Sequence, residues 1–191
     1  MFIAHLPAAY LLGTALKQRW PQATTPAAWA ALLLASIAPD LDLLYFYGFS
    51  DRSFNHHIYP PHVPIVWLLT SVLGGLCLRA GPARWRTAWA VPWAMVSTGW
   101  CLHLVLDTVA GGIWWLWPWV TTPYVLMPIF PRRFDNAWLN MLSHPLMAVE
   151  VLIVAGAAWR WRQAQQLKPL TAFKRRNFSC QMPKRPYRTF L

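Results

Sequence analysis

The chain has 191 residues, of which 57% are hydrophobic and 12% charged, and its formal net charge is +11. Soluble domains carry about 25% charged residues, so this composition excludes an ordinary soluble protein and is typical of a chain embedded in a lipid bilayer. The basic residues lie between the apolar stretches and near the C-terminus, which argues against a nucleic-acid-binding surface.

Five apolar segments predict membrane helices: Ile3 to Leu16, Pro26 to Phe49, Val63 to Ala80, Ala88 to Gly111, and Leu146 to Trp161. A helix needs about 20 apolar residues to cross the hydrocarbon layer, and the three middle segments are long enough. The first and last are shorter, so each could instead be tilted, re-entrant or interfacial. We therefore predict an all-α fold, a polytopic transmembrane bundle of about five segments.

Lys and Arg divide unevenly between the two sides of such a bundle. If all five segments cross, one side receives every Lys and Arg except Arg52, Arg132 and Arg133. Because Lys and Arg mark the cytoplasmic side, we expect the N-terminus outside and the C-terminus in the cytoplasm.

Two further segments have a distinctive composition. The stretch from Gly111 to Pro131 is rich in Trp and Pro, and we expect a loop in the outer interface, because indole rings favour the headgroup level and Pro interrupts helices. The C-terminal stretch combines many basic residues with scattered Phe, which predicts a flexible cytoplasmic arm drawn to anionic lipids. We therefore expect a transmembrane domain at 1–162 and a basic tail at 163–191, with membrane lipids as partners and no nucleic acid.

The acidic residues and histidines are few and unusually placed. Four acids, Asp40, Asp42, Asp107 and Glu150, stand inside or at the ends of apolar segments, where a central charge costs about 2.5 to 3.5 kcal/mol. The first three of these acids fall at or near the outer face, in an orientation assigned from Lys and Arg alone. All six histidines fall there too: His5, His56, His57, His62, His103 and His144. This convergence predicts a metal-binding cluster at the outer face.

Two pairs of these residues have informative spacing. His103 and Asp107 are four apart, so on a helix they share one face and offer nitrogen and oxygen ligands to a divalent ion. Asp40 and Asp42 are two apart and would diverge on a helix. Either one of them binds metal while the other bridges or orients, or the backbone bends after Pro39.

The loop histidines can reach the same place. Prolines between His57 and His62 favour an extended turn that can return both rings to one locus. His5, near the outer start of the first segment, is the expected further ligand. For His56 a metal role and ordinary hydration are equally supported, while His144 and Glu150 are expected to make ordinary polar contacts.

The ordered motifs resemble the YdjM-like family, regarded as inner-membrane metal-dependent hydrolases and distantly similar to zinc-dependent phospholipases C and related single-strand nucleases. The resemblance covers roughly Met1 to Trp119 and leaves the tail after Arg160 unmatched. In this sequence Leu43 stands where the family usually has His, and Ile58 where it often has Arg. The motifs are Ala4-His5-Leu6-Pro7, Pro39-Asp40-Leu41-Asp42, His56-His57 with His62, Leu102-His103-Leu104-Val105-Leu106-Asp107, Gly111-Gly112 and Trp117-Pro118.

The resemblance implies a bacterial inner-membrane protein whose helices hold two or three divalent ions, expected to be Zn²⁺, that activate a water molecule as nucleophile. Bridging by Asp40 or Asp42 would hold two ions together, and either carboxylate could act as base; no other catalytic residue is assigned. The implied ligands are His5, Asp40, Asp42, His57, His62, His103 and Asp107.

Two functions stay open at this point. The first is hydrolysis of phosphoesters or phospholipids near the outer leaflet, with the Trp-rich loop bedding the lipid part of the substrate. The second is a non-catalytic membrane protein with a structural or metal-handling site, motivated by Leu43 and by the lack of a separate general acid. A transporter is less favoured, because no inverted repeat or pair of broken helices is evident.

Overall fold

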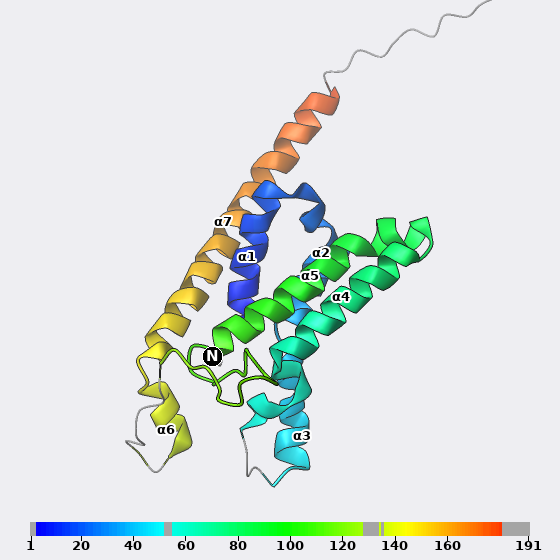
Figure 1. The fold of residues 1–191 in the computed structure, drawn as a ribbon. Helices are drawn as coiled ribbons and strands as arrows, with labels where there is room; N and C mark the ends of the chain where they lie inside the picture. Colours follow the sequence, from blue (N-terminus) through cyan, green and yellow to red (C-terminus); the bar gives the residue numbers. More distant parts are fainter. Residues whose placement is uncertain (1–2, 52–54, 128–133, 135, 181–191) are drawn as a thin grey trace, which may run out of the picture. The chain divides into compact units, whose positions relative to one another are not determined.

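The computed structural model describes residues 3–51, 55–127, 134 and 136–180, without the side chains at 24, 137, 138, 141 and 167–180. Its regular elements are helical (Figure 1), and within these residues the only β pairing is an isolated bridge between Ile113 and Tyr124. The all-α prediction is therefore confirmed. The chain divides into a unit at 1–157 and another at 158–191, each described by itself.

The first unit begins with two helices joined by a short turn: α1 (His5–Arg19), the 3₁₀ turn Pro21–Thr24, and α2 (Pro26–Ala35). Helix α2 starts with Pro26, whose missing N–H costs nothing at the first helical position, and the Thr25 side chain accepts a hydrogen bond from the Ala28 N–H. Small residues let the two helices approach, since a Cβ at Gly13 would lie 2.9 Å from the Trp29 ring.

The predicted segment Pro26 to Phe49 is not one straight helix. It divides into α2, a 3₁₀ turn at Ala38–Leu41 and α3 (Asp42–Gly48), with a bend of 55° at the break. Proline disfavours helical backbone at the residue before it and has no N–H of its own, so Pro39 explains the break. A bend is therefore present, but it lies at residues 36–37, ahead of Pro39 and of both acidic residues, and not after Pro39 as we considered.

Two 3₁₀ turns, His56–Ile58 and Pro60–His62, lead into an antiparallel pair of helices, α4 (Pro64–Ala80) and α5 (Ala83–Asp107). Hydrogen bonds join these helices: Ser97 Oγ lies 2.8 Å from Ser71 Oγ, and the Trp93 indole donates to the Ser71 carbonyl at 3.0 Å. Helix α5 packs against both α2 and α4, so it is the central helix of this unit (Figure 1).

Beyond α5 the described part of the Trp-rich segment is a loop, as predicted; Pro128, Pro131, Arg132 and Arg133 lie outside the described residues. Helices α6 (Ala137–Leu142) and α7 (Leu146–Cys180) follow. Helix α7 continues into the segment for which we expect a flexible arm, whose residues Lys184, Arg185 and Arg188 are not described. The boundary between residues 162 and 163 stays a prediction.

By length and composition, α5 alone is a clear candidate for a membrane span among the described residues. Helix α2 together with the segment to Gly48 qualifies as a broken span, and α4 is a shorter apolar helix. The predicted count of five spans is thus not established. Exposed leucines such as Leu69 and Leu73, each more than half accessible, give α4 an apolar outer face of the kind that suits lipid.

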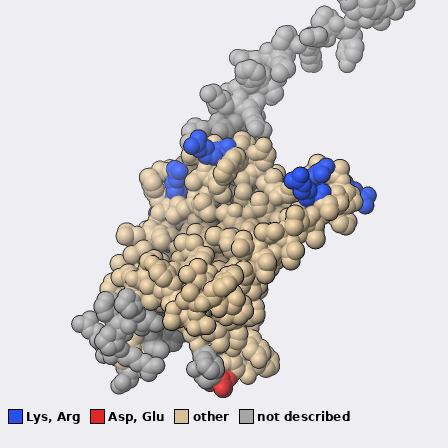
Figure 2. Space-filling view, viewed as in Figure 1, with Lys and Arg blue, Asp and Glu red and all other residues tan. Residues whose placement is uncertain are grey.

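Charged groups of the first unit lie at opposite ends of its helices. Among the described residues in Figure 2, Lys and Arg gather over the end of α1 and the turn between α4 and α5, and none is visible in the lower part of the view. Helix α1 has His5 at its first residue and Arg19 at its last. Helix α5 has Arg84 and Arg86 in its first turn and Asp107 at its last residue. At 1.5 Å per residue these helices are roughly 22 and 37 Å long, so the predicted ligands lie far from the basic ends.

Candidate metal centre

Helix α5 ends in two buried side chains of metal-ligand type, His103 and Asp107, with 0% and 2% of their surface exposed. They lie one helical turn apart, and His103 Nε2 is 2.9 Å from Asp107 Oδ2. The four-residue spacing therefore brings an imidazole and a carboxylate together, as the sequence predicts.

The break after α2 orients the ring of His103. Its Nδ1 lies 2.9 Å from the Ser36 carbonyl oxygen, which can only accept, so Nδ1 carries the proton and donates. In a continuous helix that carbonyl would accept from the N–H of Asp40, but this N–H instead donates to the Ile37 carbonyl at 3.2 Å. The bend thus leaves the Ser36 carbonyl free to accept from His103 Nδ1. The electron pair of His103 Nε2 then points into the centre.

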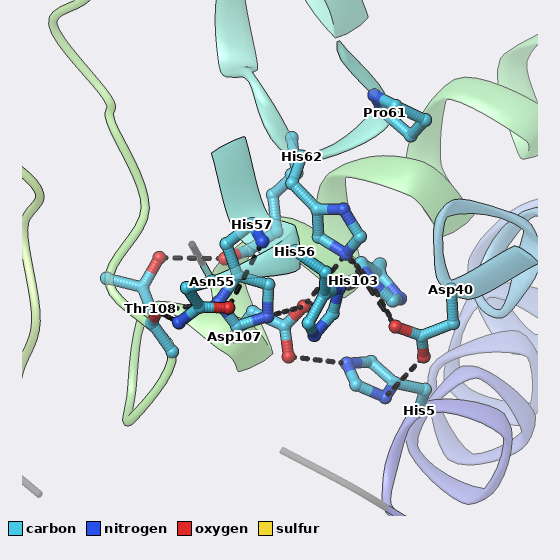
Figure 3. A network of polar contacts seen from close by, with 12 residues as sticks. His5, Asp40, Asn55, His56, His57, Pro61, His62, His103, Asp107 and Thr108 are labelled. Atoms are coloured by element: carbon cyan, nitrogen blue, oxygen red, sulfur yellow. Dashed lines mark hydrogen bonds and ion pairs between the residues drawn. The ribbon is translucent and has the colours of Figure 1, made fainter. Parts of the chain in front are cut away.

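The 3₁₀ turns supply Asp40 and His62 to the same place. Asp40 Oδ1 lies 3.6 Å from the Nε2 atoms of both His62 and His103, and those two nitrogens are 3.1 Å apart. Asp107 Oδ2 is 3.6 Å from His62 Nε2. Four side chains from three separate segments therefore turn donor atoms toward one point (Figure 3).

On its other side the ring of His62 faces Asp42. His62 Nδ1 lies 2.9 Å from Asp42 Oδ2, somewhat off the direction of a hydrogen bond, and this closeness favours a proton on Nδ1. In the neutral ring the electron pair is then on Nε2, facing that of His103. Facing electron pairs repel unless a proton or a metal ion lies between them, so the arrangement fits a positive charge at this point.

His5 approaches from α1. Its ring stacks on that of His103 with centroids 4.1 Å apart, and its Nε2 lies 3.1 Å from Asp107 Oδ1. Its Nδ1 is 3.8 Å from Asp40 Oδ2. Although the ring is buried, neither nitrogen makes a well-formed hydrogen bond to any described residue. Buried donor and acceptor atoms are normally satisfied, so these two nitrogens call for a further partner such as a metal ion.

His57 joins the centre from the first 3₁₀ turn. Its Nδ1 lies 2.6 Å from the Gly111 carbonyl, and its Nε2 is 3.5 Å from Asp107 Oδ2. A Cβ at Gly111 would fall 2.0 Å from the His57 ring, so only glycine leaves room for this imidazole. His57 therefore repeats the arrangement of His103, with Nδ1 on a main-chain carbonyl and Nε2 directed inward.

Asp42 and His56 lie at the outer edge of the cluster. The Asp42 carboxylate contacts His62 Nδ1 through Oδ2 and His56 Nδ1 through Oδ1, the latter at 3.3 Å. Asp42 thus lies behind His62, whereas Asp40 faces the centre, so the two acids of the Asp-Leu-Asp motif take different positions. From the sequence, a metal role and ordinary hydration were equally supported for His56. Only its position next to His57 pointed to the cluster.

Electrostatics differ between the two loop histidines. Burial lowers the pKa of His57 to about 4 despite the opposing effect of Asp107, so this ring is neutral near pH 7. Burial disfavours charge on His62 as well, but hydrogen bonding and charge from Asp40 and Asp42 outweigh it and raise the pKa of His62 to about 9. Without a metal ion, His62 itself therefore carries a second proton and a positive charge near pH 7.

The distances suit a tetrahedral metal ion. Asp40, His62, His103 and Asp107 each offer an atom within 4.8 Å of the others, and His56, His57 and His62 form a second such group. Zn²⁺ bonds of about 2.0 to 2.1 Å in tetrahedral geometry would place ligand atoms about 3.3 to 3.4 Å apart. The five separations in the first group that involve a histidine nitrogen run from 2.9 to 3.6 Å. This buried His/Asp cluster could hold a metal ion.

The remaining two candidates make ordinary polar contacts, as expected. Glu150, buried on α7, accepts a hydrogen bond from the Ile3 N–H at 2.6 Å. His144 Nδ1 accepts from the Leu146 N–H at 3.3 Å. Glu150 therefore ties α7 to the chain just ahead of His5.

A family model described as YdjM inner membrane protein matches residues 1–173. The chain belongs to this family. The YdjM match extends well beyond the 119 residues over which the motifs carry the resemblance, and it includes the start of the basic tail. No curated protein and no solved structure gives a significant match. Membership identifies the chain as a membrane protein, in agreement with its composition.

Proposed function

We propose that this YdjM protein is a membrane-embedded, metal-dependent hydrolase of phosphoesters. One observation carries the proposal: inward-facing nitrogen and oxygen atoms from α1, the turn after α2, the 56–62 loop and α5 converge on one buried point. Three of the imidazoles have an outward acceptor that fixes their orientation, as ligands of metal centres commonly do.

In this proposal Asp40, His62, His103 and Asp107 hold one ion. We assign Zn²⁺, because neutral imidazole and carboxylate form its usual ligand set. A second ion, held by the other group of suitable spacing (His56, His57 and His62), would need the Nδ1 proton of His62 to be lost, because only then can this ring bind one ion through each nitrogen. A third ion is not assigned. His5 completes the first site through Asp107 or by direct ligation.

The protein side chains then have distinct roles. When bound, a divalent ion neutralises phosphate charge and lowers the pKa of water, so that water can attack phosphorus. Asp40 is more exposed than the other acids of the centre and faces it, so we assign it as the base that receives the water proton. Asp42 orients His62, and His56 in turn contacts Asp42. The bond that breaks joins phosphorus to the alcohol oxygen.

We further propose that the centre faces the periplasm. The basic ends of α1, α4 and α5 would then lie at the cytoplasmic side, the C-terminus would be cytoplasmic, and membrane lipids would be the natural partners. The basis is the separation of the Lys and Arg residues from the His/Asp cluster along α1 and α5. A phosphoester at the outer leaflet would have direct access to the centre.

The test is to purify the full chain with zinc, measure bound metal by mass spectrometry, and assay nitrophenyl phosphate diesters. We expect at least one tightly bound ion per chain, and loss of metal and at least a hundredfold loss of turnover in His103→Ala and Asp107→Asn. His144→Ala, which changes a histidine outside the centre, is the control and should keep both. Full metal content and turnover in the two cluster variants would refute the proposal.

A structural metal site is the second candidate. It is favoured by the near-complete burial of His62, His103 and Asp107. It is also favoured by Leu43, which occupies the position after Asp42 where the family usually has a histidine. Catalytic sites keep one coordination position open, whereas structural sites are closed. Tightly bound metal without hydrolysis of any ester, together with unfolding when the metal is removed, would identify this second role.

A further inference from the structure

A pocket of about 370 Å³ is lined in part by residues that directly follow two histidines of the metal centre in the chain. Its walls contain no charged side chain, and two of its six lining residues are Trp. The lining residues are Ile58, Pro60, Val63, Val66, Trp114 and Trp117.

The pocket is built from the same segments that position the centre. Ile58 directly follows His57, and Val63 directly follows His62, so each is only 3.8 Å away from Cα to Cα. Trp114 is three residues beyond Gly111, whose carbonyl holds the His57 ring. The residues that would contact a ligand in the pocket are therefore close neighbours in the chain of those that carry the inward-facing nitrogens.

Hydrogen bonds hold both walls in place. The Trp100 indole donates to the Pro61 carbonyl at 2.7 Å, which ties the 58–63 turn to α5. In the opposite wall, the Trp114 indole donates to the Thr121 carbonyl at 3.0 Å, and the neighbouring Trp115 indole donates to Thr108 Oγ1 at 2.8 Å. Because the walls are fixed in this way, the pocket is preformed and does not depend on a ligand to open it.

The lining chemistry selects the occupant. A charged or strongly polar group would lose its hydration here without gaining a partner, whereas a hydrocarbon chain gains by leaving water. The volume is near the lower end of the range of about 300 to 1,000 Å³ for ligand pockets, which suits one chain and excludes a bulky headgroup. The polar end of such a molecule would then be directed to the neighbouring cluster.

We propose that this pocket binds one hydrocarbon chain of the substrate, so that the centre acts on phosphate esters of long-chain alcohols or lipids. The inference rests on the proposed function and names its substrate class. Ile58, Val63, Val66, Trp114 and Trp117 are the residues that set chain-length preference.

The experiment uses 4-nitrophenyl n-alkyl phosphates with two to ten carbons, each below its micelle concentration, and follows release of nitrophenol. Water adds to phosphorus as the bond to nitrophenol breaks, which leaves the alkyl phosphate. The full chain is kept in amphipol, because the alkyl tail of a detergent would compete for the pocket. We expect kcat/KM to rise with chain length by up to about fourfold for each methylene that enters the pocket.

Val66→Trp fills the pocket from α4, and Leu73→Trp adds the same ring at an exposed position of the same helix outside the pocket. Val66→Trp should lower kcat/KM at least tenfold for the ten-carbon ester, with the two-carbon ester within twofold and metal content unchanged. Leu73→Trp should behave as the unmodified protein. Equal kcat/KM for short and long esters, or an unchanged chain-length profile in Val66→Trp, would overturn the pocket while leaving the hydrolase intact.

If no ester is hydrolysed, the hydrolase proposal fails and the pocket is tested by binding alone. An alkyl phosphate with a terminal diazirine is crosslinked to the protein by light, and the labelled residues are mapped by mass spectrometry. Labelling at 58–66 or 114–117 that Val66→Trp abolishes would support the pocket. Labelling elsewhere, or none, would refute it.

Discussion

At the scale of single residues, the centre depends on which nitrogen of each imidazole faces inward. His103 and His57 donate from Nδ1 to the main-chain carbonyls of Ser36 and Gly111, and His62 turns its Nδ1 to Asp42. All three rings therefore present Nε2 to the carboxylates of Asp40 and Asp107. A shared orientation of this kind requires acceptors placed outside the cluster; an orienting role for Asp40 or Asp42 was considered from the sequence, whereas the two carbonyls were found only in the structure.

Gly111 provides the sharpest test at this scale. In Gly111→Ala the new Cβ would lie 2.0 Å from the His57 ring, so the ring must leave its place against Asp107. We expect metal affinity to fall at least tenfold. The helices should persist, because Gly111 lies in the loop beyond α5 and not within a helix. Isothermal titration with zinc measures the affinity.

The matched control is Gly75→Ala, at a glycine of α4 where a Cβ would meet nothing within 4 Å. This variant should bind zinc as the unmodified chain does. Unchanged zinc affinity in Gly111→Ala would mean that His57 does not contribute to the site.

The candidate ligands were largely recognisable from sequence, because the exclusion of charge from apolar helices makes buried His and Asp conspicuous. The structure brings His5, Asp40, His57, His62, His103 and Asp107 together, while ligation itself remains a prediction. The separate position of Asp42 behind His62 could not be read from residue type, because it depends on the path of the backbone after Pro39.

At the scale of elements, the approach of α5 to α2 decides whether His103 can reach the Ser36 carbonyl. A Cβ at Gly99 would fall 2.4 Å from the Leu32 carbonyl oxygen and 3.1 Å from Ala35 Cβ, so the two helices touch through this glycine. One turn further along α5, His103 meets the carbonyl that the broken helix leaves free. The close contact at Gly99 and the break after α2 therefore together bring His103 to the Ser36 carbonyl.

Gly99→Ala should force α2 and α5 apart. Overpacking of this kind costs about 1 to 3 kcal/mol of stability, and the displaced α2 would carry the Ser36 carbonyl away from His103. We expect a lower melting temperature and weaker zinc binding, measured by differential scanning fluorimetry with and without zinc. A variant as stable and as zinc-responsive as the unmodified chain would show that this contact does not set the geometry.

The sequence indicated the helical segments well, because apolar runs of this length have few alternatives. It placed their ends less well. The predicted segment Ala88 to Gly111 is observed as Ala83–Asp107, since Arg84 and Arg86 lie within the first turns of the helix despite their charge. The 3₁₀ turns at 56–62 were expected only as an extended turn, because two prolines indicate a bend without specifying its form.

At the scale of the whole molecule, the uneven distribution of Lys and Arg leads to a prediction about orientation. We expect a cysteine introduced at Thr122, in the Trp-rich loop, to react with a membrane-impermeant maleimide added to intact spheroplasts. A cysteine at Arg84, at the basic end of α5, should react only after the membrane is opened. Both variants require replacement of Cys77, Cys101 and Cys180 by Ala to remove background labelling.

Labelling of both introduced cysteines from outside, or of Arg84→Cys alone, would contradict the proposed orientation and would place the centre away from the outer leaflet. The measurement does not depend on metal binding or turnover. It therefore separates the question of which compartment the centre faces from the question of what the centre does.

The carbonyls that orient His103 and His57 have an evolutionary consequence. Every amino acid at position 36 would supply the same main-chain oxygen, so a substitution there can change the side chain without removing the contact. Comparison of related sequences would therefore identify the histidines but would not identify the carbonyl of residue 36, which orients His103. Substitutions that alter the path of the chain, near Pro39 or Gly111, are therefore where loss of function in natural variants should accumulate, although neither residue needs to touch an ion.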